Sequence, residues 1–160
     1  MLGVRMDVKY INPFIESILN NLEQMAALKA EKQDLSVTRE AKTTMDISGI
    51  IGLSGGVKGS AIISFPKPIA LAVASAMFME ELTEINEDVK DAIGEFANIF
   101  VGNARNKLVD AGLNVTISTP TIIVGTGHEI SHPQSIPFLV IPFNTELGQF
   151  SINIGVKEES

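Results

Sequence analysis

Glu95 and Asn98 place a carboxylate and a carboxamide three residues apart, and these two groups together could carry out chemistry. A carboxylate can pair with a cation, and a carboxamide can donate and accept hydrogen bonds without titrating. Because residues three apart are neighbours on a helix surface, a helix here would hold both groups side by side. Other residues would share that face: Asp91, Gly102, Arg105 and Asn106. On spacing alone, such a face is more often simply solvated.

A long helical pattern supplies the helix that this pair needs. Asn86 is suited to cap its start, two acidic residues follow in the first turn, and Gly112 favours its end. Apolar residues recur at helical spacing on the side opposite the polar face: Val89, Ile93, Phe96, Ala97, Phe100, Ala104, Leu108 and Ala111. We predict that these residues pack in the core and that Glu95 and Asn98 point to solvent.

Gly102 lies one turn after Asn98, where its missing side chain costs about 1 kcal/mol of helix stability relative to alanine. That cost favours an interpretation in which another surface comes close to the helix. Ile99 and Val109 flank the polar face. The residues that we expect to contact a partner around the pair are Asp91, Ile99, Gly102 and Arg105.

Residues 128–132, His-Glu-Ile-Ser-His, match the H-E-x-x-H pattern of zinc proteases, which requires both histidines on one face of a helix. The flanking sequence disfavours a helix, since β-type residues precede it, Gly125 and Gly127 lie just upstream, and Pro133 follows at once. The chain contains two histidines and no cysteine, so a third histidine ligand is missing. We predict a loop or strand end here and no metal site.

Residues 52–60, GLSGGVKGS, superficially resemble a phosphate-binding loop, but Gly59 separates Lys58 from Ser60 and breaks the required order. A nucleotide-binding loop also leads into a helix, whereas β-type residues resume at once here. We therefore predict a hairpin whose tight turn lies at residues 54–56, where glycine can adopt a positive φ.

Two further helices are predicted. The first begins with Asn12 as its cap and Pro13 in the first helical position, and the second covers residues 66–78. The second is largely apolar, so much of its surface should be buried. The methionines of residues 25–28 and 76–80 are predicted to fill the core and are given no function.

Short β-rich runs occupy much of the remaining chain, at residues 35–38, 43–53, 57–65, 114–118, 121–125, 137–143 and 148–156. The order of one helix, three strands, two helices and several strands indicates two related α-β-β-β halves. Sequence identity between the halves is too weak to establish a repeat. Because strands and helices do not alternate regularly, we predict one α+β domain over residues 1–160, with helices packed on an antiparallel sheet.

The composition narrows the classes of function. With 160 residues and 45% hydrophobic content, the chain can build a substantial core. Its formal charge of -7 leaves no basic stripe for nucleic acid and suits a protein partner with a basic rim. No apolar run approaches the roughly 18 residues of a membrane span, and the amino terminus lacks the apolar run of a signal peptide. We therefore expect a soluble, cytoplasmic protein.

The stretch DAIGEFANIFVGNARNKL contains Asp91, Glu95 and Asn98 in the spacing D-x-x-x-E-x-x-N. Pro120 follows in the segment STPT, and the hairpin IIGLSGGVKGSAIISF precedes the motif. Together these features resemble the signature of the CheX/CheC/FliY family of chemotaxis phosphatases, over nearly the whole chain. The hairpin and the single motif are most similar to the CheX branch. The resemblance implies a CheC-like fold.

The resemblance also implies an activity, namely removal of the phosphoryl group from the phosphoaspartate of a CheY-type response regulator. It implies that Asn98 holds a water in line with phosphorus and that Glu95 pairs with the lysine beside the phosphoaspartate. An acyl phosphate is already reactive, so positioning the water supplies most of what is needed. In this scheme Mg²⁺ belongs to the receiver domain, and we expect no cofactor bound by this chain.

A competing hypothesis is a non-catalytic adaptor that docks a signalling partner through the same helix face. Intact Glu95 and Asn98 favour the enzyme. In the related first half, Glu16 of the first helix occupies the place of Glu95, but Leu19 stands three residues later where the motif has asparagine. We therefore expect one active site per chain. The family resemblance, together with sheet edges that another chain could extend, predicts a homodimer.

Overall fold

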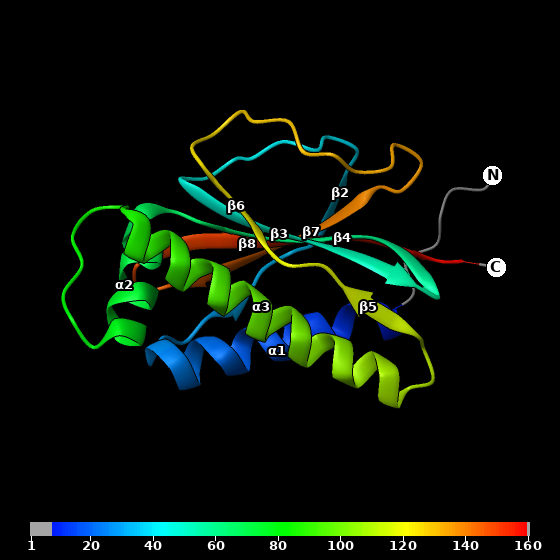
Figure 1. Cartoon of the computed structure of the whole chain (residues 1–160), viewed down its shortest axis with the longest axis horizontal. Coiled ribbons are helices and arrows are strands. Elements are labelled where there is room, and N and C mark those ends of the chain that lie inside the picture. The colour runs from blue at the N-terminus through cyan, green and yellow to red at the C-terminus, as the bar shows by residue number, and fades with distance from the viewer. Residues whose placement is uncertain (1–7, 160) are drawn as a thin grey trace.

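Three helices cover one face of an antiparallel sheet of eight strands in the computed structural model, which describes residues 8–159 (Figure 1). The helices are α1 (Val8–Ala26), α2 (Lys67–Phe78) and α3 (Glu87–Asp110). Loops between strands lie over the opposite face of the sheet (Figure 1). The predicted α+β fold is thus confirmed. No described helix combines the length and the hydrophobicity that crossing a membrane requires.

The strands are β1 (Glu31–Lys32), β2 (Ser36–Thr38), β3 (Ile47–Gly55), β4 (Val57–Phe65), β5 (Val115–Ile117), β6 (Thr121–Val124), β7 (Phe138–Thr145) and β8 (Gly148–Glu158). Their order in the sheet is β1-β7-β8-β4-β3-β5, while β2 also pairs with β7 and β6 also pairs with β3. The predicted hairpin of residues 52–60 is confirmed, because β3 and β4 pair along their length. β1 has two residues, too few for a pattern in the sequence to predict it.

The two predicted halves interlock through their short strands. The hairpins β3–β4 and β7–β8 meet at the centre of the sheet, where β4 pairs with β8. The short strands that follow α1 cross over to β7 in the second hairpin, and those that follow α3 cross over to β3 in the first. Neither half can therefore separate without breaking pairs on both sides of the sheet. The crossing carries the segment between β5 and β6 to the side of α3.

The buried face of α3 is held by close packing on the sheet. The ring of Phe96 lies 5.8 Å from that of Phe65 on β4, centroid to centroid, and Phe65 lies 5.3 Å from Phe150 on β8. A Cβ atom added to Gly49 of β3 would lie 3.1 Å from the Cβ atom of Ala97. The absence of a side chain at Gly49 therefore lets α3 lie close to the sheet. This packing fixes which residues of α3 face solvent.

The predicted ends of α2 and α3 are confirmed. The side chain of Asn86 caps α3 by accepting a hydrogen bond of 3.0 Å from the backbone N–H of Val89. The helix ends at Asp110, so Ala111 lies beyond its last turn and is exposed, and the prediction that Ala111 packs in the core is wrong. Gly112 follows with a φ of 97°. Glycine adopts that conformation without the steric cost that a Cβ atom would impose.

The predicted start of α1 is wrong. The helix begins at Val8 and contains Pro13, instead of starting at Pro13 after a cap at Asn12. Tyr10 and Ile11 are buried in the core, and the Tyr10 hydroxyl donates a hydrogen bond of 2.7 Å to the Glu158 carboxylate. Burial of these two side chains offsets the backbone hydrogen bond that proline cannot donate.

Candidate active site on helix α3

Helix α3 places Glu95 and Asn98 on its exposed face, as its amphipathic pattern predicts. Asp91, one turn before Glu95, is exposed as well. Among residues 8–159, the structure assigns no hydrogen bond or ion pair to these three side chains. In contrast, their neighbour Lys90 forms an ion pair of 2.6 Å with Glu87. The carboxylates and the amide of this face are thus available to an external group.

A groove between α3 and the start of β6 contains these three residues. Its volume is about 350 Å³, and the lining residues are Lys90, Asp91, Gly94, Glu95, Asn98, Thr119, Pro120 and Ile122. Pro120, distant from the motif in sequence, therefore lies beside Glu95 and Asn98 in space. A Cβ atom added to Gly94 would lie 3.6 Å from Ile122 and 3.9 Å from Pro120, so this wall fits closely against the helix. Thr119 is a lining residue that no pattern in the sequence indicated.

A second hollow continues from Asn98 along α3 toward β5. It measures about 380 Å³ and is lined by Asn98, Ile99, Gly102, Asn103, Arg105, Asn106, Thr116 and Ile117. A Cβ atom added to Gly102 would meet no heavy atom within 4 Å. The chain itself therefore does not require glycine at this position. Three of the predicted partner contacts, Ile99, Gly102 and Arg105, lie together here.

Arg105 is tied to its own chain. Its Nε donates a hydrogen bond of 2.9 Å to the Val115 carbonyl oxygen, and its Nη1 donates one of 3.2 Å to Asn106 Oδ1. The guanidinium group thus links α3 to β5. This link could not be predicted from the sequence, because it depends on the strand that the fold brings alongside.

A third hollow, of about 320 Å³, lies between α3 and the end of α2. Its lining residues are Met77, Phe78, Asp91, Ala92 and Glu95, so it shares Asp91 and Glu95 with the groove. Met79, which follows Phe78 in the sequence, is exposed. The prediction that the methionines of residues 76–80 fill the core is therefore wrong for Met79. When a helix is apolar on all sides, its sequence does not indicate which residues at its end are exposed to solvent.

The two histidines lie in a loop rather than on a helix, as predicted. His128 is exposed. His132 Nδ1 lies 2.9 Å from Ser60 Oγ, its Nε2 lies 2.8 Å from the Ile136 carbonyl oxygen, and its ring stacks on Phe138. Burial lowers the pKa of His132, an effect that the bond to Ile136 opposes. Residues 8–159 contain no group of three or more histidine, aspartate or glutamate side chains placed to hold a metal ion.

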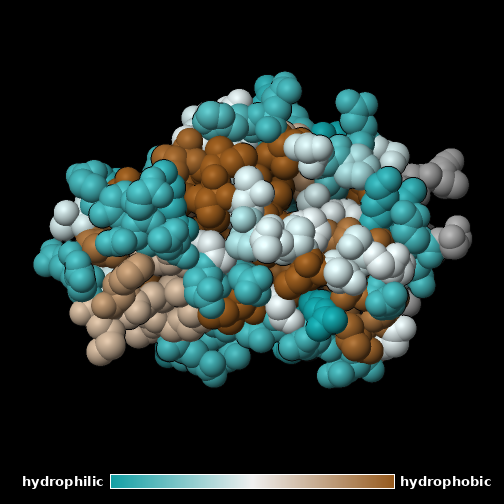
Figure 2. Space-filling view, in the orientation of Figure 1, coloured by the Kyte–Doolittle hydropathy of each residue, from teal (hydrophilic) through white to brown (hydrophobic). Residues whose placement is uncertain are grey.

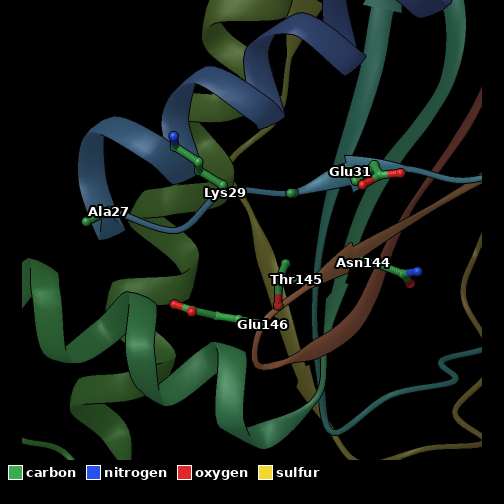
Figure 3. A pocket seen from close by; sticks show the side chains of 7 residues that line it. Ala27, Lys29, Glu31, Asn144, Thr145 and Glu146 are labelled. Atoms are coloured by element: carbon green, nitrogen blue, oxygen red, sulfur yellow. The ribbon is translucent and has the colours of Figure 1, made fainter.

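A larger hollow lies away from the motif, where α1 ends and β7 turns into β8. Its volume is about 690 Å³, and its lining residues include Lys29, Glu31, Asn144 and Glu146. Their polar ends point in different directions instead of converging on one point (Figure 3). The face of α3 that carries Asp91, Glu95 and Asn98, the motif face, is therefore the better candidate for an active site.

Comparison with known proteins shows extensive similarity. Residues 47–144 match the sequence model of a family described as "Chemotaxis phosphatase CheX". A CheY-P phosphatase CheX of Thermotoga maritima is 29% identical over 153 residues, 95% of this chain and 98% of the relative. A crystal structure of a CheC-like superfamily protein from Shewanella sp. PV-4 has a TM-score of 0.85 and 33% identity, covering 95% of this chain and 99% of that one. A chain in the CheX-CheY-BeF3-Mg²⁺ crystal structure from Borrelia burgdorferi has a TM-score of 0.78 and 29% identity, covering 96% and 100%.

Proposed function

Because this chain belongs to the chemotaxis phosphatase CheX family, we propose that it dephosphorylates the phosphoaspartate of a CheY-type response regulator. The observation that carries the proposal is the pairing of Glu95 and Asn98, exposed and unengaged, in one groove with Pro120. The Thermotoga relative is named a CheY-P phosphatase, and the Borrelia structure contains CheX with CheY, beryllium fluoride and Mg²⁺. Both support a receiver domain as the substrate.

In the proposed reaction, the Asn98 amide orients a water molecule in line with the phosphorus atom. The water oxygen forms a bond to phosphorus while the bond from phosphorus to the aspartate oxygen breaks. Inorganic phosphate and the free aspartate of the receiver are the products. An amide suits this task because it accepts from and donates to water without changing its own charge. Most of the acceleration then comes from positioning the water, since the acyl phosphate is already reactive.

Glu95 is proposed to pair with the lysine beside the receiver's phosphoaspartate. Its position one turn before Asn98 lets one helix present the carboxylate and the amide to a single partner site. The Mg²⁺ ion of this scheme is held by the receiver, and we propose no cofactor site on this chain. Asp91, Ile99, Gly102 and Arg105 complete the proposed contact surface around the pair.

A homodimer is also proposed. The short strands β2 and β6 lie outermost beside β7 and β3, and each carries an exposed valine, Val37 and Val124. A second chain could cover such an edge. Sedimentation equilibrium at micromolar concentration should give twice the monomer mass, and a monomer mass would contradict the proposal. The proposed location is the cytoplasm, as expected from the sequence.

The direct test is release of inorganic phosphate from a panel of phosphorylated CheY-type receivers with Mg²⁺, in the presence and absence of this protein. We expect release from at least one receiver to accelerate well beyond its intrinsic rate. Binding to a receiver without any acceleration would instead favour the non-catalytic adaptor, which would dock through the same face of α3.

A further inference from the structure

The end of α2 exposes two large apolar side chains beside the candidate active site. Phe78, the last residue of the helix, is 43% exposed, and Met79, its C-cap, is 91% exposed. Figure 2 shows this end of the molecule as a pale brown patch at the lower left, bordered by hydrophilic residues. Exposed apolar patches of this kind on a folded domain are typical of interaction surfaces.

The fold does not require a methionine at position 79. This residue has φ 55° and ψ 40°, a left-handed conformation that asparagine and glycine adopt more readily. The turn is held by Ser75, whose carbonyl oxygen accepts from the Met79 N–H and whose hydroxyl accepts a bond of 2.9 Å from the Leu82 N–H. The Met79 side chain therefore adds little burial to the fold and sits on an unfavourable backbone.

This apolar end is continuous with the motif face. The hollow between α2 and α3 is lined by Met77, Phe78 and Ala92, together with Asp91 and Glu95. Asp91 and Glu95 also line the groove that contains Asn98. A partner that contacts Glu95 can therefore also contact the side chain of Phe78, because both residues line this hollow.

The surrounding charge indicates the chemistry of that partner. Residues 80–95 carry seven carboxylates and one lysine, a net charge of −6, in a chain whose formal charge is -7. Lys90 in this segment is already paired with Glu87, and Glu84 pairs with Lys67. A concentration of negative charge around an apolar hollow favours a partner with basic residues around an apolar side chain.

We propose that the end of α2 is a second docking surface for the phosphorylated receiver, and that it selects which receiver is dephosphorylated. An apolar side chain of the receiver enters the hollow between Phe78 and α3, while basic side chains of the receiver face residues 80–95. This inference rests on the proposed function. It assigns specificity to Phe78 and Met79, outside the pair assigned to the chemical step.

The test uses Met79→Asn and Phe78→Ser, with CheY-type receivers loaded with beryllium fluoride and Mg²⁺ as binding probes. We expect each variant to bind its receiver about fivefold or more weakly, to raise KM by a similar factor and to leave kcat within about twofold. Met79→Asn should melt at or above the wild-type temperature, because asparagine tolerates the left-handed conformation. A loss of affinity in this variant could not then be attributed to unfolding.

Leu35 is 44% exposed and lies between β1 and β2, each of which pairs with β7, and it does not line the two hollows that contain Glu95. Leu35→Ser is therefore the matched control. This control variant should leave receiver affinity unchanged.

Unchanged affinity in both α2 variants would overturn the docking surface while leaving phosphatase activity intact. A wild type that binds receivers but releases no phosphate would overturn the proposed function, and the affinities of the variants would still decide the docking surface. Altered self-association with unchanged receiver affinity would assign the surface to a second copy and overturn the inference.

Discussion

Helix α3 and the loop that contains the two histidines both carry residues in patterns known from enzymes, yet the fold uses them differently. Glu95 and Asn98 are exposed, and residues 8–159 provide them with no hydrogen-bond partner. His132 instead has both ring nitrogens within hydrogen-bond distance of its own chain, at Ser60 and Ile136. A catalytic group has to be free to bind reactants. Engagement by the rest of the chain therefore separates these two patterns better than residue type or spacing does.

The largest expected effect is the loss of phosphatase activity in Asn98→Ala. The variant should lower kcat about 100-fold or more, because the attacking water would lose the group that we propose orients it. Its free energy of unfolding should stay within about 0.5 kcal/mol of the wild type, since the side chain is exposed and unpaired. Binding to a beryllium fluoride-loaded receiver should persist. Undiminished phosphate release would contradict the mechanism even with the family membership intact.

Glu95→Ala should produce a smaller and different defect. Removing the carboxylate deletes the proposed ion pair with the receiver's lysine, so receiver affinity should fall about tenfold as well as the rate. The wild-type affinity should weaken as salt is added, and the variant should show a shallower dependence. The variant with both substitutions should be no slower than the poorer single one, because we propose that the two residues complete one site and act as a unit. Additive losses in kcat would argue against this shared role.

His132→Ala should leave phosphatase activity near the wild-type level and reduce stability. The substitution removes two hydrogen bonds and the stacking on Phe138, so the free energy of unfolding should fall by about 2–3 kcal/mol. Urea denaturation measures this change. The matched control is His128→Ala, whose side chain is exposed, with an expected change within about 0.5 kcal/mol. A loss of phosphatase activity in a folded His132→Ala protein would show that the loop contributes to the reaction.

The same histidine should make stability depend on pH. Its pKa is lowered from the ordinary value of 6.5 by burial, so the unfolded chain takes up a proton before the folded chain does. The stability that neutral His132 contributes is thus fully present above pH 6.5 and is lost as the pH falls toward the lower pKa of the folded state. His132→Ala should flatten this part of the curve. If the free energy of unfolding of the variant depended on pH as it does in the wild type, other titrating groups would be responsible for that dependence.

The smallest expected effect is a gain in stability for Gly102→Ala. The added methyl group meets no atom within 4 Å, so the free energy of unfolding should rise by about 0.5–1 kcal/mol through better helix propensity. If a receiver comes close to α3 at this point, phosphatase activity should nevertheless fall, and fall further in Gly102→Leu. Full activity in both variants would remove Gly102 from the contact surface.

Local patterns predicted much of this molecule. Residues near one another in sequence set the helical period of α3, its cap at Asn86 and the hairpin at residues 52–60, so these features could be predicted without knowing the fold. The start of α1 could not, because burial of Tyr10 and Ile11 decides it. The exposure of Met79 could not be predicted either. In an apolar helix, the sequence does not distinguish an end that is buried by other elements from an end that is exposed to solvent.

The sequence by itself determined that Glu95 and Asn98 share one solvent-facing side of a helix, because a period of 3.6 residues follows from backbone geometry alone. Only the tertiary structure decided what stands beside them. Crossing of the short strands brings Pro120 to one side of Glu95, and packing of α2 on α3 brings Phe78 to the other. These neighbours depend on strand pairing and core packing between distant segments, which no local pattern encodes. Energies summed over the whole domain select that arrangement.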